Sequence, residues 1–213
     1  MTYELVLELS HGLSLVQAHL DMVDEIAVLA NNPNVARNLN LQFPSPYTRE
    51  DAEKWIRSCS DPQSWRATSI SDDPFDQEQQ QNGRNASKVP TTCIICLNGM
   101  PIGAVGIDFA SNQSQYPRTG TMGYWLGEPY WGRGYATIVV KAWVDYVWRT
   151  FPWCYRIESD RYGWNVASGR VLEKAGIQLE GVQRAKLFRD GEVSDLYVYG
   201  LSRPELEYER GVD

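Results

Sequence analysis

The chain of 213 residues is poor in the residues that metal and redox sites need, with two histidines, His11 and His19, and four cysteines. Cys93 and Cys96 have the CxxC spacing of such a site, but no second CxxC or histidine pair accompanies them. In an extended strand, positions three apart point to opposite faces. We therefore predict no metal site and expect both cysteines to be small apolar residues of a core strand.

Clusters of positive charge and long apolar runs are also missing. The formal net charge is -7 and the lysines and arginines are scattered, whereas a nucleic-acid-binding protein carries a basic stripe. The sequence contains no run of about 18 apolar residues, the length that a membrane-spanning helix needs. The first ten residues alternate and include two glutamates, unlike a secretory signal. We expect a cytoplasmic protein with free thiols and no nucleic-acid or membrane partner.

Residues 71–90 differ in kind from the rest of the chain. Aspartate, asparagine and glutamine dominate this stretch, which holds too little apolar surface to order itself. Too little sequence precedes it for a separate core, so we predict a mobile insertion within a single domain that spans residues 1–213. A loop of this kind is either a functional lid or a connection without a role in function.

The pattern of apolar residues predicts a mixed α/β protein. Strands are expected over residues 3–9, 92–97, 102–109, 120–126, 155–159, 177–187 and 193–201. Helices are expected through residues 26–29, from 48 to about 59, and over 135–149 and 165–175. In the helix over 135–149, polar residues recur every four positions, so we expect most of its surface to be buried.

Local signals define several element boundaries. Asp21 or Asp24 is expected to cap the first helix. Thr48 and Asp51 form the capping box that begins the second helix. The dipeptide at 98–99, Asn-Gly, is typical of the turn of a β-hairpin.

Two glycines lie between a strand and the long buried helix, in the segment 131–136, WGRGYA. A helix N-terminus presents unsatisfied N–H groups and a partial positive charge, and glycines let the backbone approach an anion closely. Such a turn can hold a pyrophosphate, and Arg133 would add a charged contact. Alternatively, glycine only supplies the positive φ of a tight turn. The spacing is neither that of a P-loop nor that of a dinucleotide-binding motif.

The surrounding residues resemble the acetyl-CoA motifs of the GNAT superfamily of N-acetyltransferases. Residues 123–137, GYWLGEPYWGRGYAT, look like the RimJ/RimL-type branch, whose members acetylate ribosomal proteins. A second matching set follows at 156–158 (RIE), 165–168 (NVAS) and 171–176 (VLEKAG). The resemblance covers about residues 91–201, and two ordered motifs make it specific.

This resemblance implies a GNAT-like α/β (α+β) fold. Its central sheet would be mixed and mostly antiparallel, with about seven strands flanked by helices and a split between the fourth and fifth strands. Acetyl-CoA would be the co-substrate. The implied cofactor-binding residues are Trp125, Leu126, Trp131, Gly132, Arg133, Gly134, Tyr135, Ala136, Thr137, Asn165, Ser168 and Lys174.

The resemblance also assigns roles to some of these residues. The backbone of Trp125 and Leu126 would face the pantetheine arm and the acetyl carbonyl, and Ser168 would face the thioester sulfur. Each residue has a purely structural alternative. Trp125 is then a core residue, Asn165 is only a helix N-cap, and Ser168 is an ordinary residue of the first helical turn.

Two positions depart from the family pattern. Thr121 stands where many relatives carry a glutamate as general base, and Leu172 where many carry a tyrosine as general acid. We expect Ser168 to replace the acid and Glu158, through water, to replace the base, with Asp108 second. A weak base suits an amine of low pKa, about 7.7–8.0 for an α-amine against about 10.4 for lysine.

The sequence therefore predicts an acetyl-CoA-dependent N-acetyltransferase that acts on a primary amine, as a monomer or a homodimer. The acceptor is a small molecule or a peptide N-terminus, expected to bind near residues 38–47 and 185–195. Because Thr121 replaces the usual base, a non-catalytic acetyl-CoA sensor is the main alternative. The second alternative is a protein-interaction domain that uses residues 71–90, and the third is a nucleotide-binding regulator.

Overall fold

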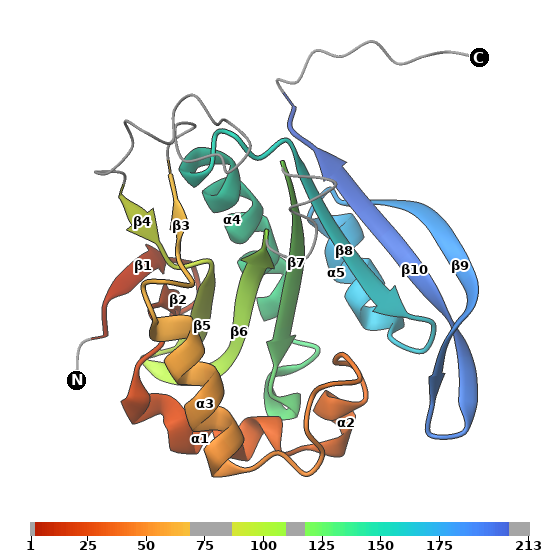
Figure 1. Cartoon of the computed structure of the whole chain (residues 1–213), viewed down its shortest axis with the longest axis horizontal. Coiled ribbons are helices and arrows are strands. Elements are labelled where there is room, and N and C mark those ends of the chain that lie inside the picture. Colours follow the sequence, from red (N-terminus) through yellow and green to blue (C-terminus); the bar gives the residue numbers. More distant parts are fainter. Residues whose placement is uncertain (1–2, 69–86, 110–117, 205–213) are drawn as a thin grey trace.

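The computed structural model describes residues 3–68, 87–109 and 118–204 (Figure 1). Most strands form one sheet in the order β1-β2-β5-β6-β7-β8-β10-β9. Neighbouring strands are antiparallel except β7 and β8, which are parallel. The predicted mixed, mostly antiparallel sheet is confirmed. Its strands are β1 (Leu5–Glu8), β2 (Leu13–Val16), β5 (Thr92–Leu97), β6 (Met100–Asp108), β7 (Thr119–Leu126), β8 (Arg156–Tyr162), β9 (Gln178–Arg189) and β10 (Glu192–Ser202).

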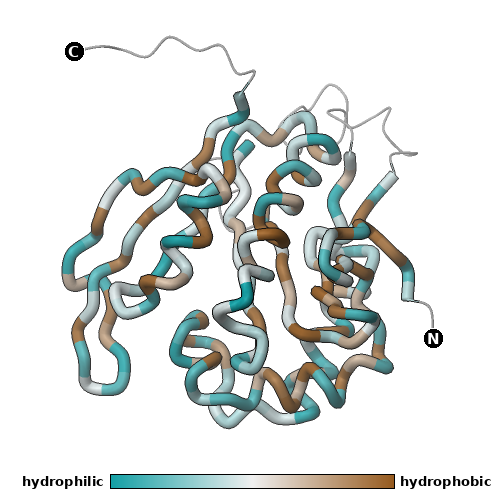
Figure 2. Tube along the Cα trace, turned by 180° about the vertical axis from the view of Figure 1, so that it is seen from behind, coloured by the Kyte–Doolittle hydropathy of each residue, from teal (hydrophilic) through white to brown (hydrophobic). Residues whose placement is uncertain are grey.

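Helices cover both faces of this sheet (Figure 1). On one face, α4 (Tyr135–Thr150) and α5 (Val166–Lys174) pack over a core cluster that includes the fully buried Trp143. On the other face, α1 (Val23–Ala30) and α3 (Arg49–Ser60) enclose a second cluster with Ile26 and Ile56. The hydropathy view shows apolar residues along these elements (Figure 2). As predicted, α4 exposes only a narrow polar stripe, at Lys141, Asp145 and Arg149.

The two cysteines of the CxxC segment lie on opposite faces of β5, as expected for a core strand. Cys93 belongs to the cluster under α4, whereas Cys96 belongs to the cluster under α1 and α3, and both are fully buried. Burial raises the pKa of the Cys96 thiol to about 12, so this thiol stays protonated at neutral pH. Because the two side chains lie on opposite faces of the sheet, Cys93 and Cys96 cannot bind the same metal ion.

The cap predicted for the first helix is wrong. The chain enters α1 through a 3-10 turn, η1 (Leu20–Met22), at whose start His19 Nδ1 accepts a hydrogen bond from the amide of Asp21 at 3.2 Å. Met22 then precedes α1 and makes no side-chain cap. Because of this extra turn, Asp21 and Asp24 lie inside the first turns of η1 and α1, where their charge complements the helix dipole.

Four further short elements escaped prediction because each is too short to show a period. Strand β2 has four residues, and α2 (Pro33–Ala36) is a single turn. A separate hairpin pairs β3 (Arg66–Ala67) with β4 (Lys88–Val89). The end of the insertion predicted over 71–90 is therefore wrong, because residues 88–89 are a strand. The rest of that prediction falls on residues 69–86, which lie outside the described residues.

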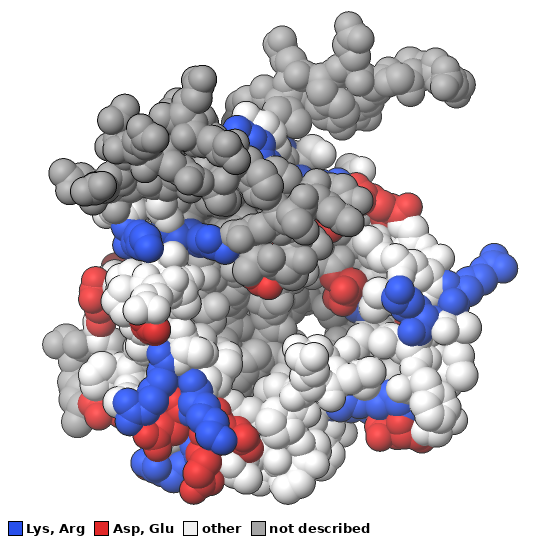
Figure 3. Space-filling model, viewed as in Figure 1, with Lys and Arg blue, Asp and Glu red and all other residues white. Residues whose placement is uncertain are grey.

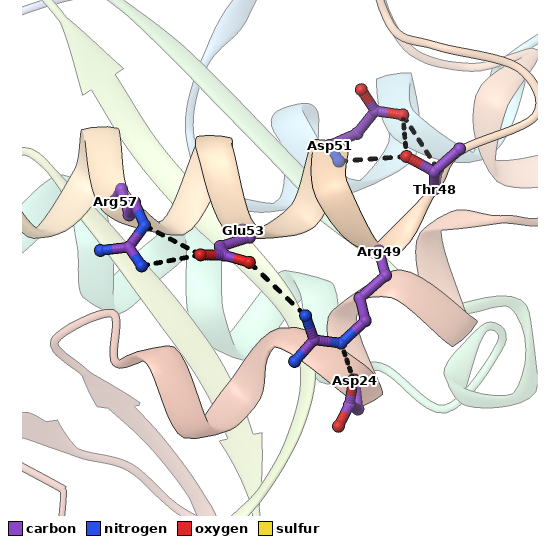
Figure 4. A network of polar contacts seen from close by, with 6 residues as sticks. All are labelled: Asp24, Thr48, Arg49, Asp51, Glu53 and Arg57. Carbon is purple, nitrogen blue, oxygen red and sulfur yellow. Dashed lines mark hydrogen bonds and ion pairs between the residues drawn. The ribbon is translucent and has the colours of Figure 1, made fainter.

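The capping box that begins α3 is confirmed (Figure 4). Thr48 Oγ1 accepts a hydrogen bond from the amide of Asp51 at 3.2 Å, and Asp51 Oδ2 accepts one from the amide of Thr48 at 2.9 Å. The hydrogen bonds that Asp51 Oδ2 accepts from the amide and from the hydroxyl of Thr48 lower the pKa of the Asp51 carboxyl. Arg49 Nε donates to Asp24 of α1 at 2.7 Å and Arg49 Nη1 lies 3.5 Å from Glu53, so charged contacts join the two helices.

Replacing Thr48 with alanine is expected to lower the free energy of unfolding by about 1 kcal/mol, because the amide of Asp51 at the start of α3 loses its side-chain partner. Urea denaturation of the two proteins measures the difference. Thr48→Ser keeps the hydroxyl and should retain most of the stability. Equal midpoints for the alanine variant and the parent protein would show that the box contributes nothing.

The sheet splits between β7 and β8, as the family resemblance implied. The two strands pair only where Thr119, Gly120 and Thr121 face Arg156, Ile157 and Glu158. Beyond this point β7 continues to Leu126 and β8 continues to Tyr162. Backbone groups on the facing edges of the two strands are therefore available to a ligand.

Candidate functional site

The glycine turn lies open at the start of α4. Gly132 and Gly134 have φ angles of 72° and 80°, and a Cβ built on either would meet no atom within 4 Å. Gly134 is the N-cap of α4 and supplies no side-chain cap. The first bonded amides are those of Thr137 and Ile138, 3.1 and 3.2 Å from Gly134 O. Amides at 132–136 make no backbone hydrogen bond within the described part of the chain, so they can bind an anion.

The side chains around this turn hold it in place. Trp131 Nε1 donates a hydrogen bond to Leu126 O at 2.7 Å, which ties the turn to the end of β7. Glu128, in the 3-10 turn η3 (Glu128–Tyr130), accepts hydrogen bonds from Asn32 Nδ2 at 2.7 Å and Asn34 Nδ2 at 2.8 Å. Arg133 is exposed, whereas Tyr135, Ala136 and Thr137 are half-buried. The turn is thus fixed to both β7 and α2 while its amides stay accessible.

Of the two strand residues proposed for cofactor binding, Leu126 presents its backbone to the split. Gly127 N donates to Ile102 O at 2.9 Å, on the side of β6. Backbone groups alternate along a strand, so the amide of Trp125 also faces β6, and those of Leu126 and Tyr124 face β8. The carbonyl of Leu126 is occupied by Trp131, which leaves its amide as the available donor. Trp125 contributes its ring, which packs against the second core cluster.

The start of α5 lies across the split from β7. Asn165 is the N-cap of α5, and its Oδ1 accepts a hydrogen bond from the amide of Ser168 at 3.2 Å. Ser168 Oγ lies 2.8 Å from Tyr124 Oη, and Ser168 O accepts a bond from the same hydroxyl at 3.2 Å. Burial raises the pKa of Tyr124 to about 12, so this phenol is neutral at physiological pH. The two hydroxyls therefore form a pair that can hold and move a proton.

Tyr124 is the site residue that the sequence analysis missed. It lies within the first motif, but its partner Ser168 comes from the second motif and from another element. A signal was present in the alternation of β7, which places Tyr124 on the same face as Met122 and Leu126. These two residues belong to the core cluster under α4, and Tyr124 packs against it.

The close approach of α5 to the sheet depends on Gly169. A Cβ at this position would lie 2.5 Å from Arg161 Nε and 2.6 Å from Tyr199 Oη, so any other residue would push these two side chains away. This contact positions the preceding residue, Ser168. Lys174 is exposed in the last turn of α5, about 9 Å along the helix from Ser168, so the two residues are separate parts of any binding surface.

The two candidate bases flank the position of the missing glutamate. Thr121 pairs with Asp108 of β6 on one side and with Glu158 of β8 on the other. Residues paired across strands share a face, so the three side chains form one row. Glu158 accepts a hydrogen bond from Arg156 Nε at 2.6 Å, and Arg156 Nη1 donates to Glu180 at 3.0 Å.

This ion-pair network occupies Glu158. The contact with Glu180, which has the larger effect, and the contact with Glu158 raise the pKa of the Arg156 guanidinium. Asp108 lines the cavity on the face of α1 and α3. The structure therefore brings Asp108 to the cavity and commits Glu158 to a salt bridge.

That cavity has a volume of about 640 Å³. It lies between the segment 39–47, α3 and the strands β6 and β7, and Figure 3 shows this face of the molecule hollowed. Of the two regions predicted for the acceptor, residues 38–47 supply lining side chains, but residues 185–195 do not. Residues 185–195 belong to the hairpin of β9 and β10, which instead binds the chain next to the cavity. Arg189 Nη1 donates a hydrogen bond to Leu39 O at 2.8 Å, and Arg37 forms an ion pair with Glu192 at 3.0 Å.

Within the described residues, no group of three or more histidine, cysteine, aspartate and glutamate side chains could hold a metal ion. Within the same residues, no helix is long and apolar enough to cross a membrane.

A sheet that splits beside an uncapped helix, with a cavity over β6 and β7 on one side of the split, defines the class of splayed-sheet acetyltransferase folds. The chain belongs to the GNAT acetyltransferase family, whose domain profile, "Acetyltransferase (GNAT) domain", matches residues 13–178.

Curated relatives agree with this family. The chain is 34% identical over 90 residues to the probable N-acetyltransferase YjcK of Bacillus subtilis, covering 42% of this chain and 49% of that protein. It is 30% identical over 96 residues to the prophage-derived N-acetyltransferase YokL of the same organism, covering 44% of this chain and 54% of the relative. The chain thus spans about half the length of the curated relatives it matches.

Solved structures show the same fold. RimL, a ribosomal L7/L12 alpha-N-protein acetyltransferase in complex with coenzyme A, has a TM-score of 0.65 at 18% identity, covering 92% of this chain and 96% of that one. Mycobacterium smegmatis RimJ in complex with CoA-disulfide has a TM-score of 0.67 at 17% identity, covering 94% and 87%. The predicted likeness to the RimJ/RimL-type branch is confirmed at the level of the fold.

Proposed function

We propose that this protein is an N-acetyltransferase that moves the acetyl group of acetyl-CoA directly to a primary amine of a small molecule or a peptide N-terminus. The observation that carries the proposal is the uncapped N-terminus of α4, which opens at the end of β7 beside the split in the sheet. Acetyl-CoA supplies an acetyl group activated as a thioester. Four free cysteines fit a reducing, cytoplasmic setting.

Binding of the cofactor follows from the geometry of the turn. The amides of residues 133–136 would donate to the pyrophosphate, with the side chain of Thr137 beside them and Arg133 adding charge. Gly132 and Gly134 leave space for the phosphates to approach, because neither has a neighbour within 4 Å of a Cβ position. Lys174 is free to meet a more distant part of the cofactor from the exposed end of α5.

Acetyl transfer needs a group that stabilises the developing negative charge on the carbonyl oxygen. The amide of Leu126 faces the split and is held rigidly by the strand and by the bond between its carbonyl and Trp131. One fixed donor of this kind contributes about 2.7–4 kcal/mol to catalysis. We assign this role to Leu126 rather than to Trp125, whose amide faces β6.

The departing thiolate must also receive a proton. Ser168 would face the sulfur, and its hydroxyl lies 2.8 Å from Tyr124 Oη. A phenol with a pKa of about 12 holds its proton at neutral pH. After Ser168 has protonated the thiolate, Tyr124 would pass its proton to Ser168 and take another from solvent, which restores both hydroxyls. Asn165 fixes this serine by accepting a hydrogen bond from its amide.

The amine must lose a proton before it attacks. We propose that Asp108, through a water molecule, accepts this proton, because Asp108 lines the cavity next to Thr121. Glu158, on the other side of Thr121, is engaged by Arg156. A base that acts through water suits an amine of low pKa, such as an α-amine at about 7.7–8.0.

Asp108→Asn is expected to lower kcat about 100-fold, whereas Glu158→Gln should lower it less than Asp108→Asn does, since general base catalysis contributes roughly 10²–10⁴-fold. Steady-state rates across pH 6–9 measure both variants, and the loss for Asp108→Asn should shrink as pH rises because more amine is already neutral. A larger loss of kcat for Glu158→Gln than for Asp108→Asn would show that Glu158, and not Asp108, is the base.

Release of free thiol from acetyl-CoA, followed over a panel of amines, tests the proposed function itself. We expect faster acetylation of α-amines than of lysine side chains. Calorimetric binding of acetyl-CoA without turnover on any amine would instead support the acetyl-CoA sensor, and absence of binding would reject both.

A further inference from the structure

We infer that the acceptor is a primary amine joined by a short linker to a flat aromatic ring. This inference rests on the proposed function, because it concerns the substrate of the same site. It follows from the shape of the cavity floor, the side chains that wall the cavity and the charges at one end.

The floor of the cavity is a flat patch of backbone. On the face of α1 and α3, β6 presents Ala104 and Gly106, and β7 presents Gly123, which is paired directly with Gly106. A Cβ built on Gly123 would meet no atom within 4 Å, so open space lies above it. A Cβ on Gly106 would come within 2.7 Å of Thr92 Oγ1, so a side chain closes the patch on that side. Such a slot accepts a planar group.

The walls of this slot are aromatic. Phe43 and Tyr47 stack with their ring centroids 4.7 Å apart and their planes 14° apart. Trp55 of α3 and Trp125 of β7 complete the walls. Phe43, Trp55 and Trp125 are only half-buried, so part of each ring remains uncovered toward the cavity. An aromatic ligand would remove this apolar surface from water and stack against the rings.

The charged side chains that line the cavity favour a cation. Among the described residues, Asp51 and Asp108 are the acidic lining residues, and Lys54 is the basic one. One oxygen of Asp51 is engaged by Thr48. Asp108 lies one step beyond the glycine patch, because Thr121, its partner, is two residues from Gly123. This step is about 7 Å along the strand, a separation that a short linker between ring and amine can cover together with a water molecule between the amine and the carboxylate.

Other acceptors fit this cavity less well. A polyamine needs several carboxylates spaced along its length, whereas the described part of the chain brings two to this cavity. A peptide would bring backbone N–H and C=O groups against aromatic rings and a bare glycine floor, where they would lose their hydrogen bonds to water. An α-amine beside an aromatic side chain meets the needs of both the slot and a weak base.

Phenylalaninamide and alaninamide test the inference as a matched pair, because both carry an α-amine and only the first has a ring. With acetyl-CoA saturating, kcat/KM is expected to be at least tenfold higher for phenylalaninamide than for alaninamide, spermidine or a tetrapeptide that begins with alanine. Phe43→Leu should raise the KM for phenylalaninamide more than the KM for alaninamide. Equal or higher kcat/KM for spermidine or the tetrapeptide would overturn the inference.

A substitution in the slot floor provides the second readout. Gly123→Ala should lower kcat/KM for phenylalaninamide at least tenfold and that for alaninamide less than threefold. Gly181→Ala, in β9, is the matched control, since its surroundings are equally open and it lies outside the cavity lining. Equal losses of kcat/KM for phenylalaninamide and alaninamide would contradict the proposal that an aromatic ring binds in the slot. Thermal unfolding and calorimetric binding of acetyl-CoA are measured for each variant, so failure of the proposed function would appear separately, as absence of cofactor binding or of any turnover.

Discussion

Gly134→Val is expected to weaken acetyl-CoA binding at least 100-fold. Gly134 has a φ of 80° at the N-cap of α4. A β-branched residue is strained in this left-handed conformation, at a cost of about 1–2 kcal/mol, so the turn would move and its amides would turn away. Each hydrogen bond from such an amide to a charged phosphate contributes about 1.5–3 kcal/mol, and about 1.4 kcal/mol corresponds to a tenfold change in affinity.

The chain offers a matched control for this variant. Gly191, in the turn between β9 and β10, has a φ of 83°, and a Cβ there would also meet no atom within 4 Å. Gly191→Val should therefore introduce similar backbone strain, seen as a similar fall in thermal midpoint, without changing the dissociation constant measured by calorimetry. If both variants bound acetyl-CoA as tightly as the parent protein, the amides of the turn would not hold the cofactor.

Ser168→Ala is expected to lower kcat about 100-fold while the dissociation constant for acetyl-CoA stays within about threefold of the parent value. A positioned proton donor contributes roughly 10²–10⁴-fold to rate, and removing it affects the transition state rather than cofactor binding. Tyr124→Phe keeps the ring but removes the hydroxyl that lies 2.8 Å from Ser168 Oγ, so it should lower kcat by about tenfold. The double variant should be no slower than Ser168→Ala, because the two hydroxyls act in series.

The pH dependence of kcat separates this role from a structural one. Burial raises the pKa of Tyr124 to about 12, so its hydroxyl is protonated at every pH below that value. No loss of rate from ionisation of Tyr124 is expected up to pH 10. Tyr146, on α4, has a pKa raised to the same value and serves as control, since Tyr146→Phe should leave kcat unchanged. Equal losses for the two phenylalanine variants would indicate damaged packing.

Local sequence signals predicted those parts of the fold whose cause lies within a few residues. The capping box of Thr48 and Asp51, the hairpin turn at 98–99 and the polar stripe of α4 are confirmed for this reason. The helix α1 was placed correctly but its cap was not, because a 3-10 turn before it has no sequence period of its own. The split between β7 and β8 came from the family resemblance, since nothing in the apolar pattern distinguishes a paired strand from a diverging one.

In the candidate site, too, contacts between residues far apart in the sequence could not be predicted. The open glycine turn could be located from its residues because a helix N-terminus needs only local sequence. The contact between Tyr124 and Ser168 could not, because 44 positions separate the two residues. Likewise, the choice between Asp108 and Glu158 depends on strand register and on Arg156, whose pairing with Glu180 joins β8 to β9.

The most direct test of the account follows the backbone amides of residues 132–136 by nuclear magnetic resonance while coenzyme A is added. These amide resonances should shift strongly, those around Gly191 should not, and acetyl-pantetheine, which lacks the diphosphate, should leave the amides of the turn unchanged. If coenzyme A bound while these resonances stayed in place, the diphosphate would lie elsewhere and the central claim would be contradicted.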